Sequence, residues 1–389
     1  MIDQRTAIVH DWFQGFHGSE RVVETIRRQL FAPGNAPDVF TFAAARELLP
    51  PELARAIVQE SRLSRLPGVR QRGDSFGRWR LFLPYMPTYF DRLDLDRYDL
   101  VISSSHAFAT RVRTRADAVH VCYCYTPARY LWLHDVDPSR AGRLASLALR
   151  FDKDRLRRLD REASDRPDGY VAISQAVRDR VRVFYGREAE VIHPPVDIAD
   201  FQRDADEERS DFLWIGRLVP YKRPDAVVEL FRNLPFRLTM IGVGPLEARL
   251  RADLPANVEL LGWVGRDELV ERLRRARALV HLAEDDFGMV MVEALAAGTP
   301  VIALERGGAL DIVRPGEDGI LVGQGIAEQR HAIEVVAARG WDRSLLAERA
   351  QLFSPERFVE RFGLFVARLQ AAAARSSSSS NPAAERSQE

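Results

Sequence analysis

The sequence predicts an α/β protein with two Rossmann-like, doubly wound parallel-sheet domains. Three observations lead there: the chain has 389 residues, short apolar runs alternate with longer amphipathic stretches, and this series restarts near residue 210. Such a length suits two domains of about 150–200 residues each. Near-continuous apolar strands are typical of parallel sheets that carry helices on both faces.

The apolar runs form two series, separated by a charged, aperiodic segment at 200–210 that is typical of an interdomain linker. The first series comprises 6–12, 39–43, 99–105, 120–126, 169–174 and 189–194, and the second comprises 211–216, 237–242, 258–263, 278–283, 300–304 and 319–323. Helical patterns lie between them at 20–30, 224–233, 265–276 and 290–297. We therefore expect one domain over 1–200 and another over 211–355.

The end of the chain predicts a helix followed by a tail. Residues 356–374 carry apolar side chains at helical spacing, and the resulting stripe must pack on one of the two domains. These side chains are Phe358, Phe362, Phe365, Val366 and Leu369. The polar, low-complexity tail at 375–389 is predicted to be disordered.

Bulk composition excludes several classes of protein. The formal net charge is zero, so no global electrostatic argument favours a nucleic-acid partner. The only cysteines, Cys122 and Cys124, are expected to be free thiols in a reducing compartment. Neither a signal peptide nor an apolar run of about 18 residues is present, so we expect a cytoplasmic protein without a spanning helix.

One segment of the first domain is strongly basic. Residues 62–80 contain six arginines against Asp74 alone, and an apolar, aromatic run follows. This composition suits contact with an anionic membrane or an anionic acceptor. A solvated helical face is the alternative interpretation.

The segment at 284–302 carries the strongest functional signal. A strand ends just before Asp285, a turn with Gly288 follows, and a helix begins near Met289. Ligands bind at the carboxyl ends of strands in open α/β sheets, and the start of a helix attracts phosphate. Asp285 and Glu293 then suit the sugar and the ribose of a nucleotide-sugar. Helix capping by the aspartates, with Glu293 as an exposed acid, is the competing interpretation.

A second motif at 216–225 supplies positive charge. Arg217 and Lys222 lie in a loop between a strand and a helix that begins at Pro224. Two fixed cations can stabilise a departing diphosphate, although a basic surface loop has the same pattern. A divalent metal would otherwise do this, but no Asp-x-Asp pair stands at a strand end, so we expect no metal and no other cofactor. The pairs are Asp94/Asp96, Asp135/Asp137, Asp152/Asp154 and Asp204/Asp206.

The first strand–helix turn contains Gly15 and Gly18 but lacks the dinucleotide-binding glycine pattern. Three further side chains, His106, Tyr125 and Arg129, follow strands of the first domain. His106 has the chemistry of a general acid or base, and a hydrogen-bonded structural histidine is the alternative.

The motifs of the chain, taken together, resemble those of a known family, the retaining family 4 glycosyltransferases of the GT-B fold. The motifs that carry the resemblance are GRLVPYKRPD (216–225), IGVGPLEARL (241–250), EDDFGMVMVEALAAGTPVIA (284–303) and GGALDIVRPGEDGILV (307–322). The first domain resembles the mannosyltransferases of O-antigen and exopolysaccharide assembly, in IVHDW (8–12), SERVVE (19–24), YDLVISSSHAFA (98–109), HVCYCYTPARYLW (120–132) and VIHPPVD (191–197).

The resemblance implies two domains facing across a cleft, a terminal helix crossing back to the first domain, and metal-independent transfer of mannose from GDP-mannose. It implies that Arg217 and Lys222 bind the diphosphate and that Asp285 and Glu293 are the family's paired acids. The implied donor-binding residues are Gly18, Gly216, Gly244, Phe287, Gly288, Met289 and Val290, and the acceptor-side residues are His106, Tyr125 and Arg129. The implied acceptor is a glycan or a lipid-linked glycan at the inner membrane face, with 62–80 against the lipid.

The chain departs from the family pattern at three positions. Asp285 stands where relatives usually have Glu, Tyr125 where they commonly have His, and Ser19 where they commonly have Gly. One alternative is therefore a transferase that uses a donor of the UDP-glucose type. Others are a GT-B epimerase or phosphorylase, or a binding partner with weakened catalytic activity. A phosphorylase needs a lysine for pyridoxal phosphate, and the chain has only Lys153 and Lys222.

Overall fold

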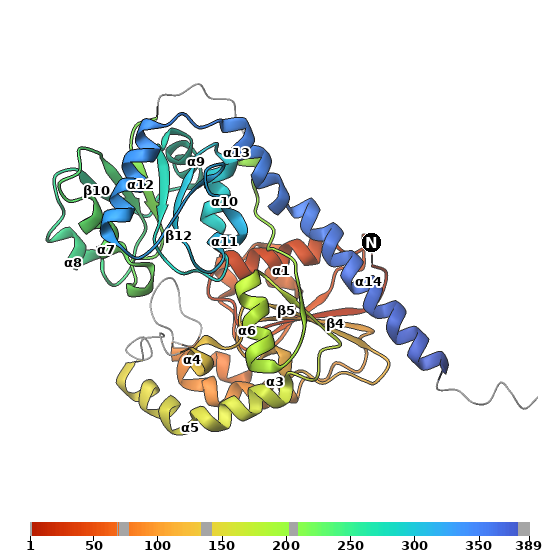
Figure 1. Ribbon diagram of the computed structural model, residues 1–389. Helices are drawn as coiled ribbons and strands as arrows, with labels where there is room; N and C mark the ends of the chain where they lie inside the picture. The colour runs from red at the N-terminus through yellow and green to blue at the C-terminus, as the bar shows by residue number, and fades with distance from the viewer. Residues whose placement is uncertain (1, 68, 70–77, 134–141, 202–208, 380–389) are drawn as a thin grey trace, which may run out of the picture. The chain divides into compact units, whose positions relative to one another are not determined.

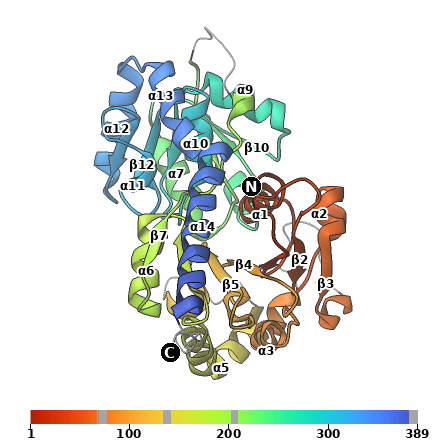
Figure 2. The same cartoon turned by 90° about the vertical axis from the view of Figure 1, so that its right-hand side faces the viewer.

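The computed structural model of the protein describes residues 2–67, 69, 78–133, 142–201 and 209–379. The chain divides into two compact units (Figures 1 and 2). Unit 1 comprises Met1–His193 and Phe358–Glu389, and unit 2 comprises Pro194–Arg357. Each unit contains one sheet, and every strand pairing in both sheets is parallel.

Unit 1 has a seven-stranded sheet of order β3-β2-β1-β4-β5-β6-β7. Its strands are β1 (Thr6–His10), β2 (Asp38–Thr41), β3 (Ile57–Glu60), β4 (Leu100–Ser105), β5 (Val119–Cys124), β6 (Gly169–Ala172) and β7 (Ala189–Val191). Its helices are α1 (Gly18–Gln29), α2 (Pro51–Ala56), α3 (Met86–Asp91), α4 (Arg129–Trp132), α5 (Gly142–Ala163) and α6 (Gln175–Tyr185). The edge strand β3 was not predicted, because two of its four residues are exposed and its apolar run is too short to register.

Unit 2 has a six-stranded sheet of order β10-β9-β8-β11-β12-β13. Its strands are β8 (Phe212–Ile215), β9 (Leu238–Ile241), β10 (Val258–Gly262), β11 (Ala278–His281), β12 (Val301–Leu304) and β13 (Gly319–Val322). Its helices are α7 (Pro224–Phe231), α8 (Glu247–Arg251), α9 (Arg266–Arg275), α10 (Met289–Ala296), α11 (Ala309–Ile312), α12 (Ile326–Ala338) and α13 (Arg343–Ala350).

Short 3₁₀ turns complete the two units. They are η1 (Arg46–Leu48), η2 (Arg62–Arg65), η3 (Arg78–Tyr85), η4 (Ala109–Arg111), η6 (Ala199–Phe201), η7 (Pro220–Lys222) and η8 (Gln351–Phe353). Each sheet has its own apolar core, built around Phe40, Phe42, Phe90 and Phe108 in unit 1 and around Phe212, Trp214, Phe231 and Met240 in unit 2. Cys122 and Cys124 are both buried in β5, and neither forms a disulfide.

The C-terminal helix α14 (Pro355–Ser379) packs against unit 1 along the stripe predicted for it (Figure 1). The rings of Phe358 and Phe362 lie 5.6 and 5.7 Å from the ring of Tyr123. The helix continues five residues beyond the expected end at 374, so 375–379 are helical and not part of a disordered tail. The preceding alanines at 371–374 are the strongest helix formers and carry the helix onward. Residues 380–389 lie outside the described part of the chain.

The predicted fold class is confirmed, since both units are doubly wound parallel sheets. The strand order reverses between β1 and β4 in unit 1 and between β8 and β11 in unit 2. In such sheets, ligands bind beyond the carboxyl ends of the strands at the reversal. Within the described residues, no helix combines the length and apolarity that crossing a bilayer requires.

Candidate functional site

The loop after β8 is held rigidly against its neighbour at the reversal in unit 2. The N–H groups of Gly216 and Leu218 donate to the carbonyl oxygens of Ile241 and Val243, at 3.0 and 2.9 Å. The backbones approach so closely that a Cβ at Gly244 would lie 2.6 Å from the carbonyl oxygen of Leu218. Gly216 and Gly244, both predicted to bind the donor, therefore shape the loop that carries Arg217 and Lys222.

The loop after β11 is supported from behind by a pair of glycines. The Gly308 N–H donates to the carbonyl oxygen of Asp285 at 2.9 Å. A Cβ at Gly307 would lie 2.3 Å from that same oxygen, and one at Gly308 would lie 2.2 Å from the carbonyl oxygen of Phe287. The backbone from Asp285 to Phe287 is therefore fixed by a neighbour that only glycine can supply.

These two loops bring Lys222 and Asp285 into an ion pair. Both side chains are largely buried, with 17% and 11% of their surfaces exposed. Burial opposes both charges and is the largest single influence on Asp285, but Lys222 and His281 together outweigh it and hold the pKa of Asp285 well below its usual range. Burial alone would lower the pKa of Lys222, but the combined attraction of Asp285, Tyr221 and Asp286 outweighs it and raises that pKa. Lys222 is therefore not a solvated surface cation, whereas Arg217 on the same loop is exposed.

A third side chain, His281 at the end of β11, completes this cluster. Its Nε2 atom lies 3.1 Å from Oδ2 of Asp285, and its side chain is 2% exposed. No role was predicted for His281, because it shows no metal-ligand spacing in the sequence and its partner is identified only by the path of the loop.

Helix α10 begins at the predicted turn, with Gly288 as its N-cap in the left-handed region at φ +95°. The N-cap position is held by Gly288 and not by Asp285 or Asp286, and it carries no side-chain cap. The first N–H groups, on Met289 and Val290, have no partner within the helix and are available to a phosphate. The Phe287 ring is buried and packs at 5.6 Å against the Phe353 ring, so only its backbone can face a ligand.

Glu293, one turn into α10, is 12% exposed and pairs with Arg266 at 3.5 Å. It is therefore not the exposed surface acid of the competing interpretation. Arg266 also contacts Asp200 at 3.2 Å and stacks 4.4 Å over the Phe201 ring. The Arg266 guanidinium thus connects the second acid of the predicted pair to the start of unit 2. Its partners lie 27 and 66 positions away in the sequence, so no local pattern indicates this link.

The reversal in unit 1 is organised by Asp11, which directly follows β1. Its carboxylate accepts the backbone N–H groups of four successive residues, His106, Ala107, Phe108 and Ala109, at 2.7 to 2.9 Å. The side chain is fully buried. Asp11 therefore fixes the turn after β4, and sequence analysis missed it because its partners lie 95 to 98 positions away.

A directed chain of hydrogen bonds leads from His10 to Tyr125. The Tyr125 hydroxyl donates to the Ser19 carbonyl oxygen at 3.1 Å, so it accepts from the Ser104 hydroxyl at 3.0 Å. The Ser104 hydroxyl in turn accepts from His10 Nδ1 at 3.0 Å. Burial raises the pKa of Tyr125, which stays a neutral phenol. Its remaining lone pair can accept a hydrogen bond from a ligand hydroxyl.

The other side chains predicted for the acceptor side lie in the same unit. Burial lowers the pKa of His106 to about 4, so its ring is neutral near pH 7 and is no cationic acid. That ring lies 4.2 Å from the Trp12 ring and 6.0 Å from the Tyr125 ring. Gly18 is the first residue of α1, and Arg129 is the half-buried first residue of α4.

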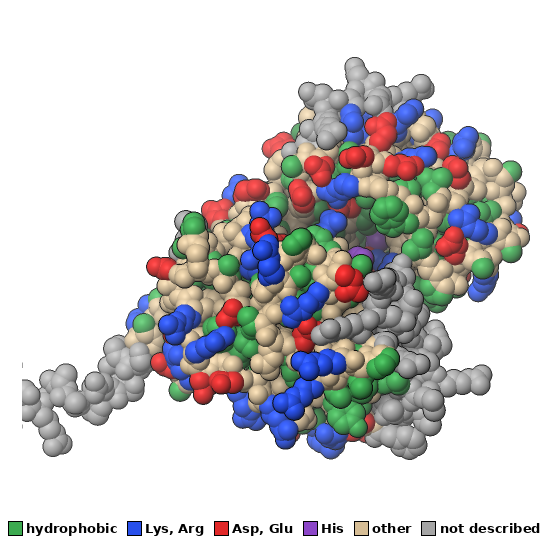
Figure 3. All heavy atoms as spheres, turned by 180° about the vertical axis from the view of Figure 1, so that it is seen from behind, with side chains coloured by type: hydrophobic (Ala, Val, Ile, Leu, Met, Phe, Trp, Pro, Cys, Tyr) green, Lys and Arg blue, Asp and Glu red, His purple; other side chains and the backbone are tan. Residues whose placement is uncertain are grey.

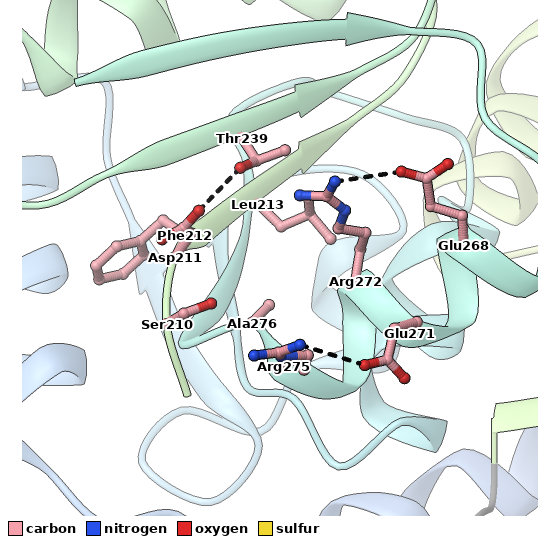
Figure 4. Close-up of a pocket in the computed structure, with 10 residues that line it drawn as sticks. All are labelled: Ser210, Asp211, Phe212, Leu213, Thr239, Glu268, Glu271, Arg272, Arg275 and Ala276. Carbon is pink, nitrogen blue, oxygen red and sulfur yellow. Dashed lines mark hydrogen bonds and ion pairs between the residues drawn. The ribbon is translucent and has the colours of Figure 1, made fainter. Parts of the chain in front are cut away.

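The cavity in Figure 4 lies at the opposite end of β8 from Lys222 and Asp285. It has a volume of about 430 Å³ and is lined by Ser210, Asp211, Phe212, Leu213, Thr239, Glu268, Glu271, Arg272, Arg275 and Ala276. Its charged side chains are paired, Arg272 with Glu268 at 3.2 Å, Arg275 with Glu271 at 3.7 Å, and Asp211 with Arg237 at 3.9 Å. It is therefore a separate feature from the candidate site.

The predicted basic segment at 62–80 is described only in part. Arg62 and Arg65 lie on η2, next to exposed Leu66, whereas 68 and 70–77 lie outside the described residues. Figure 3 shows basic side chains gathered beside apolar ones on the lower part of one face. Of the predicted aspartate pairs, Asp135/Asp137 and Asp204/Asp206 also lie outside the described residues. In the described part, no three His, Cys, Asp or Glu side chains gather as a metal site would require.

Two family profiles match the chain. Residues 16–200 match Glycosyltransferase Family 4, and residues 196–350 match Glycosyl transferases group 1. The D-inositol 3-phosphate glycosyltransferase of Acidothermus cellulolyticus is 30% identical over 346 residues, which cover 77% of this chain and 73% of that protein.

Other relatives align over shorter stretches. The D-inositol 3-phosphate glycosyltransferase of Mycobacterium sp. (strain KMS) is 32% identical over 42% of this chain, and the alignment spans only 43% of that protein's length. The GDP-mannose-dependent alpha-mannosyltransferase of Mycobacterium tuberculosis is 34% identical over 34% of this chain and 38% of its own.

Solved structures share the fold at lower identity. Sucrose-phosphate synthase from Thermosynechococcus elongatus superposes with a TM-score of 0.72 at 20% identity, covering 95% of this chain and 100% of that one. Anabaena HepE in complex with UDP superposes with a TM-score of 0.67 at 17% identity, covering 94% and 100%.

Proposed function

This chain belongs to glycosyltransferase family 4, and from that premise we propose that it transfers a sugar from a nucleotide-sugar to a glycan or lipid-linked acceptor. One observation carries the proposal, namely the buried Lys222–Asp285 pair at the strand reversal of unit 2, beside the open start of α10. A cation, a carboxylate and free N–H groups at one strand end match the phosphate and hydroxyl groups of such a donor.

Each group has a distinct task in this proposal. Lys222 and Arg217 neutralise the diphosphate, together with the N–H groups of Met289 and Val290. Asp285 accepts hydrogen bonds from hydroxyls of the donor's sugar. Glu293 accepts them from the ribose, in place of its contact with Arg266.

The reaction would retain the configuration of the sugar. The bond between the anomeric carbon and the diphosphate oxygen breaks, and the acceptor oxygen bonds to the same face of an oxocarbenium-like centre. The acceptor's proton passes to the departing phosphate oxygen. The protein's contribution is positioning and electrostatic preorganisation, with fixed cations and N–H groups facing the charge that develops on the leaving group. We propose that no metal is required.

Mannose from GDP-mannose is the donor that we propose. Support comes from the mannosyltransferase-like motifs of the first domain and from the M. tuberculosis relative, which is named as GDP-mannose-dependent. A donor of the UDP-glucose type is the alternative, since HepE has been solved with UDP-glucose. Tyr125 stands where relatives commonly have His. Its hydroxyl can only accept a hydrogen bond from the donor's sugar or from the acceptor substrate.

The acceptor is proposed to lie at the inner face of a membrane. Arg62 and Arg65, with the exposed side chains of Leu66, Leu81 and Tyr85, provide the mixture of basic and apolar groups that binds anionic lipid. Neutralising Arg70, Arg72 and Arg78 should release the protein from vesicles of anionic phospholipid. Unchanged sedimentation with these vesicles would refute the membrane contact.

A thermal-shift screen against nucleotide-sugars tests the main proposal. A true donor at 100 times its Kd stabilises the protein by about 2.7 kcal/mol through mass action. We expect GDP-mannose to give the largest shift and UDP-glucose a smaller one. Silence with every nucleotide-sugar would instead favour a binding partner that has lost the activity.

A further inference from the structure

His281 stands directly beneath the turn that carries the first acid of the candidate site. It is the last residue of β11, four positions before Asp285, and its Nε2 atom lies 3.1 Å from Asp285 Oδ2. A Cβ at Gly288 would lie 3.7 Å from that nitrogen and 3.8 Å from the Asp285 Cβ. The imidazole is therefore enclosed between the strand and the glycine turn.

The nitrogen of this contact has no other polar partner among the described residues. Nε2 of His281 is buried and makes no hydrogen bond of good geometry with any described residue. A ring nitrogen this close to a carboxylate oxygen is favourable only when it carries the proton, since two lone pairs would repel each other. The contact is therefore between an N–H group and Oδ2.

Lys222 and His281 approach the same oxygen of Asp285. Among the residues that the structure describes, Oδ1 has neither an ion-pair nor a hydrogen-bond partner. The carboxylate is consequently held by one oxygen and offers the other. An aspartate has only one rotatable bond between Cβ and its carboxylate, so contacts with Oδ2 also fix the direction of Oδ1.

We propose that His281 is a positioning residue for the sugar end of the donor, which it serves by fixing the Asp285 carboxylate against β11. This rests on the proposed function. The arrangement depends on the short side chain, because a glutamate would extend its carboxylate by one methylene, beyond the reach of a ring anchored in the strand. His281 and Asp285 therefore act as a matched pair.

The test compares His281→Leu with His281→Gln, whose side-chain amide nitrogen can replace Nε2. The probes are GDP and GDP-mannose, with UDP and UDP-glucose in parallel, and the readouts are Kd, KM and kcat. We expect His281→Leu to bind the free nucleotide within twofold of wild type, and the nucleotide-sugar about tenfold more weakly with lower kcat. His281→Gln should recover most of this loss, and His331→Leu, on the exposed face of α12, should change nothing.

A double-mutant cycle with Asp285→Glu separates positioning from a general structural defect. The tenfold cost of His281→Leu should shrink to less than threefold in the Asp285→Glu background. Equal loss of nucleotide and nucleotide-sugar affinity, or an undiminished cost in that background, would overturn the inference while leaving the transferase intact. Failure of the wild-type protein to bind any nucleotide would overturn the proposed function, and this inference with it.

Discussion

Asp11 in unit 1 and Asp285 in unit 2 are both buried carboxylates beyond the strands at which the sheet order reverses, and they are neutralised by different partners. Asp11 accepts four backbone N–H groups from one turn. Asp285 instead contacts two side chains, Lys222 and His281, which come from different strands and loops.

The kind of partner determines what each acid can do. A backbone N–H that is satisfied by Asp11 cannot be released without unfolding the turn at 106–109. A lysine side chain can instead be shared with an anionic ligand, because its ammonium group carries three donors and is strongly attracted to phosphate. The first aspartate therefore builds the structure, and the second belongs to a site whose charges can be redistributed.

Asp11→Asn should produce the largest effect of the changes considered. Each Asp11 oxygen accepts two N–H groups, and an amide nitrogen in place of one oxygen leaves two donors facing another donor. At about 1–3 kcal/mol per unsatisfied group, the free energy of unfolding should fall by about 4 kcal/mol in chemical denaturation. Asp179→Asn, the same change on an exposed position of α6, is the control. If the free energy of unfolding fell by less than about 1 kcal/mol, Asp11 would not be the structural acid that the comparison with Asp285 requires.

Lys222→Ala should lower the turnover rate. Removing one preorganised donor from a developing negative charge costs at least about 100-fold, or about 2.7 kcal/mol of barrier. The measurement is the initial rate of donor consumption at saturating donor. Lys153→Ala removes the only other lysine and should leave the rate unchanged. Near-normal turnover in Lys222→Ala would show that the ion pair is structural, like the contacts of Asp11.

Glu293→Gln should weaken nucleotide binding about tenfold, because a hydrogen bond from the ribose to a carboxylate becomes one to a neutral amide. Isothermal titration of the free nucleoside diphosphate measures this loss. Glu259→Gln, on an exposed position of β10, provides the matched control. An unchanged Kd would place the ribose away from α10.

Asp160→Asn should give the smallest effect, visible only as a change with pH. Burial raises the pKa of Asp160 to about 7, although Trp132 and Tyr185 donate to its carboxylate. The folded state therefore holds a proton that the unfolded state releases near pH 4, and the stability from this proton is lost as the pH rises through 7. Between pH 6 and 8, wild-type protein should lose about 1 kcal/mol more stability than Asp160→Asn. Parallel stability curves would contradict a raised pKa.

Sequence patterns predicted the fold well, because each buried strand shows a continuous apolar run that is local in sequence. They also placed Lys222 and Asp285 in the loops after two strands and Glu293 in the helix that follows, since loops that follow neighbouring parallel strands must meet at one edge. The edge strand β3 was missed because half of it is exposed.

Contacts between distant residues could not be predicted in this way. Nothing near Asp11 indicates that its partners lie almost a hundred residues later, and His281 gains a partner only through the path of the turn that follows it. Phe287 was predicted as a donor-binding residue, and its aromatic ring fills a core position. The side-chain direction at a tight turn depends on the neighbouring elements, and the sequence of the turn does not contain them.

Arg266 gives the candidate site a thermodynamic link to the first residues of unit 2. It donates to the Asp197 carbonyl oxygen at 3.1 Å while it pairs with Asp200 and Glu293. A single guanidinium thus serves both the segment at 197–201 and an acid of the site. A ligand that draws Glu293 away from Arg266 changes the free energy of that segment, and by reciprocity any rearrangement of the segment changes the affinity for that ligand by the same amount.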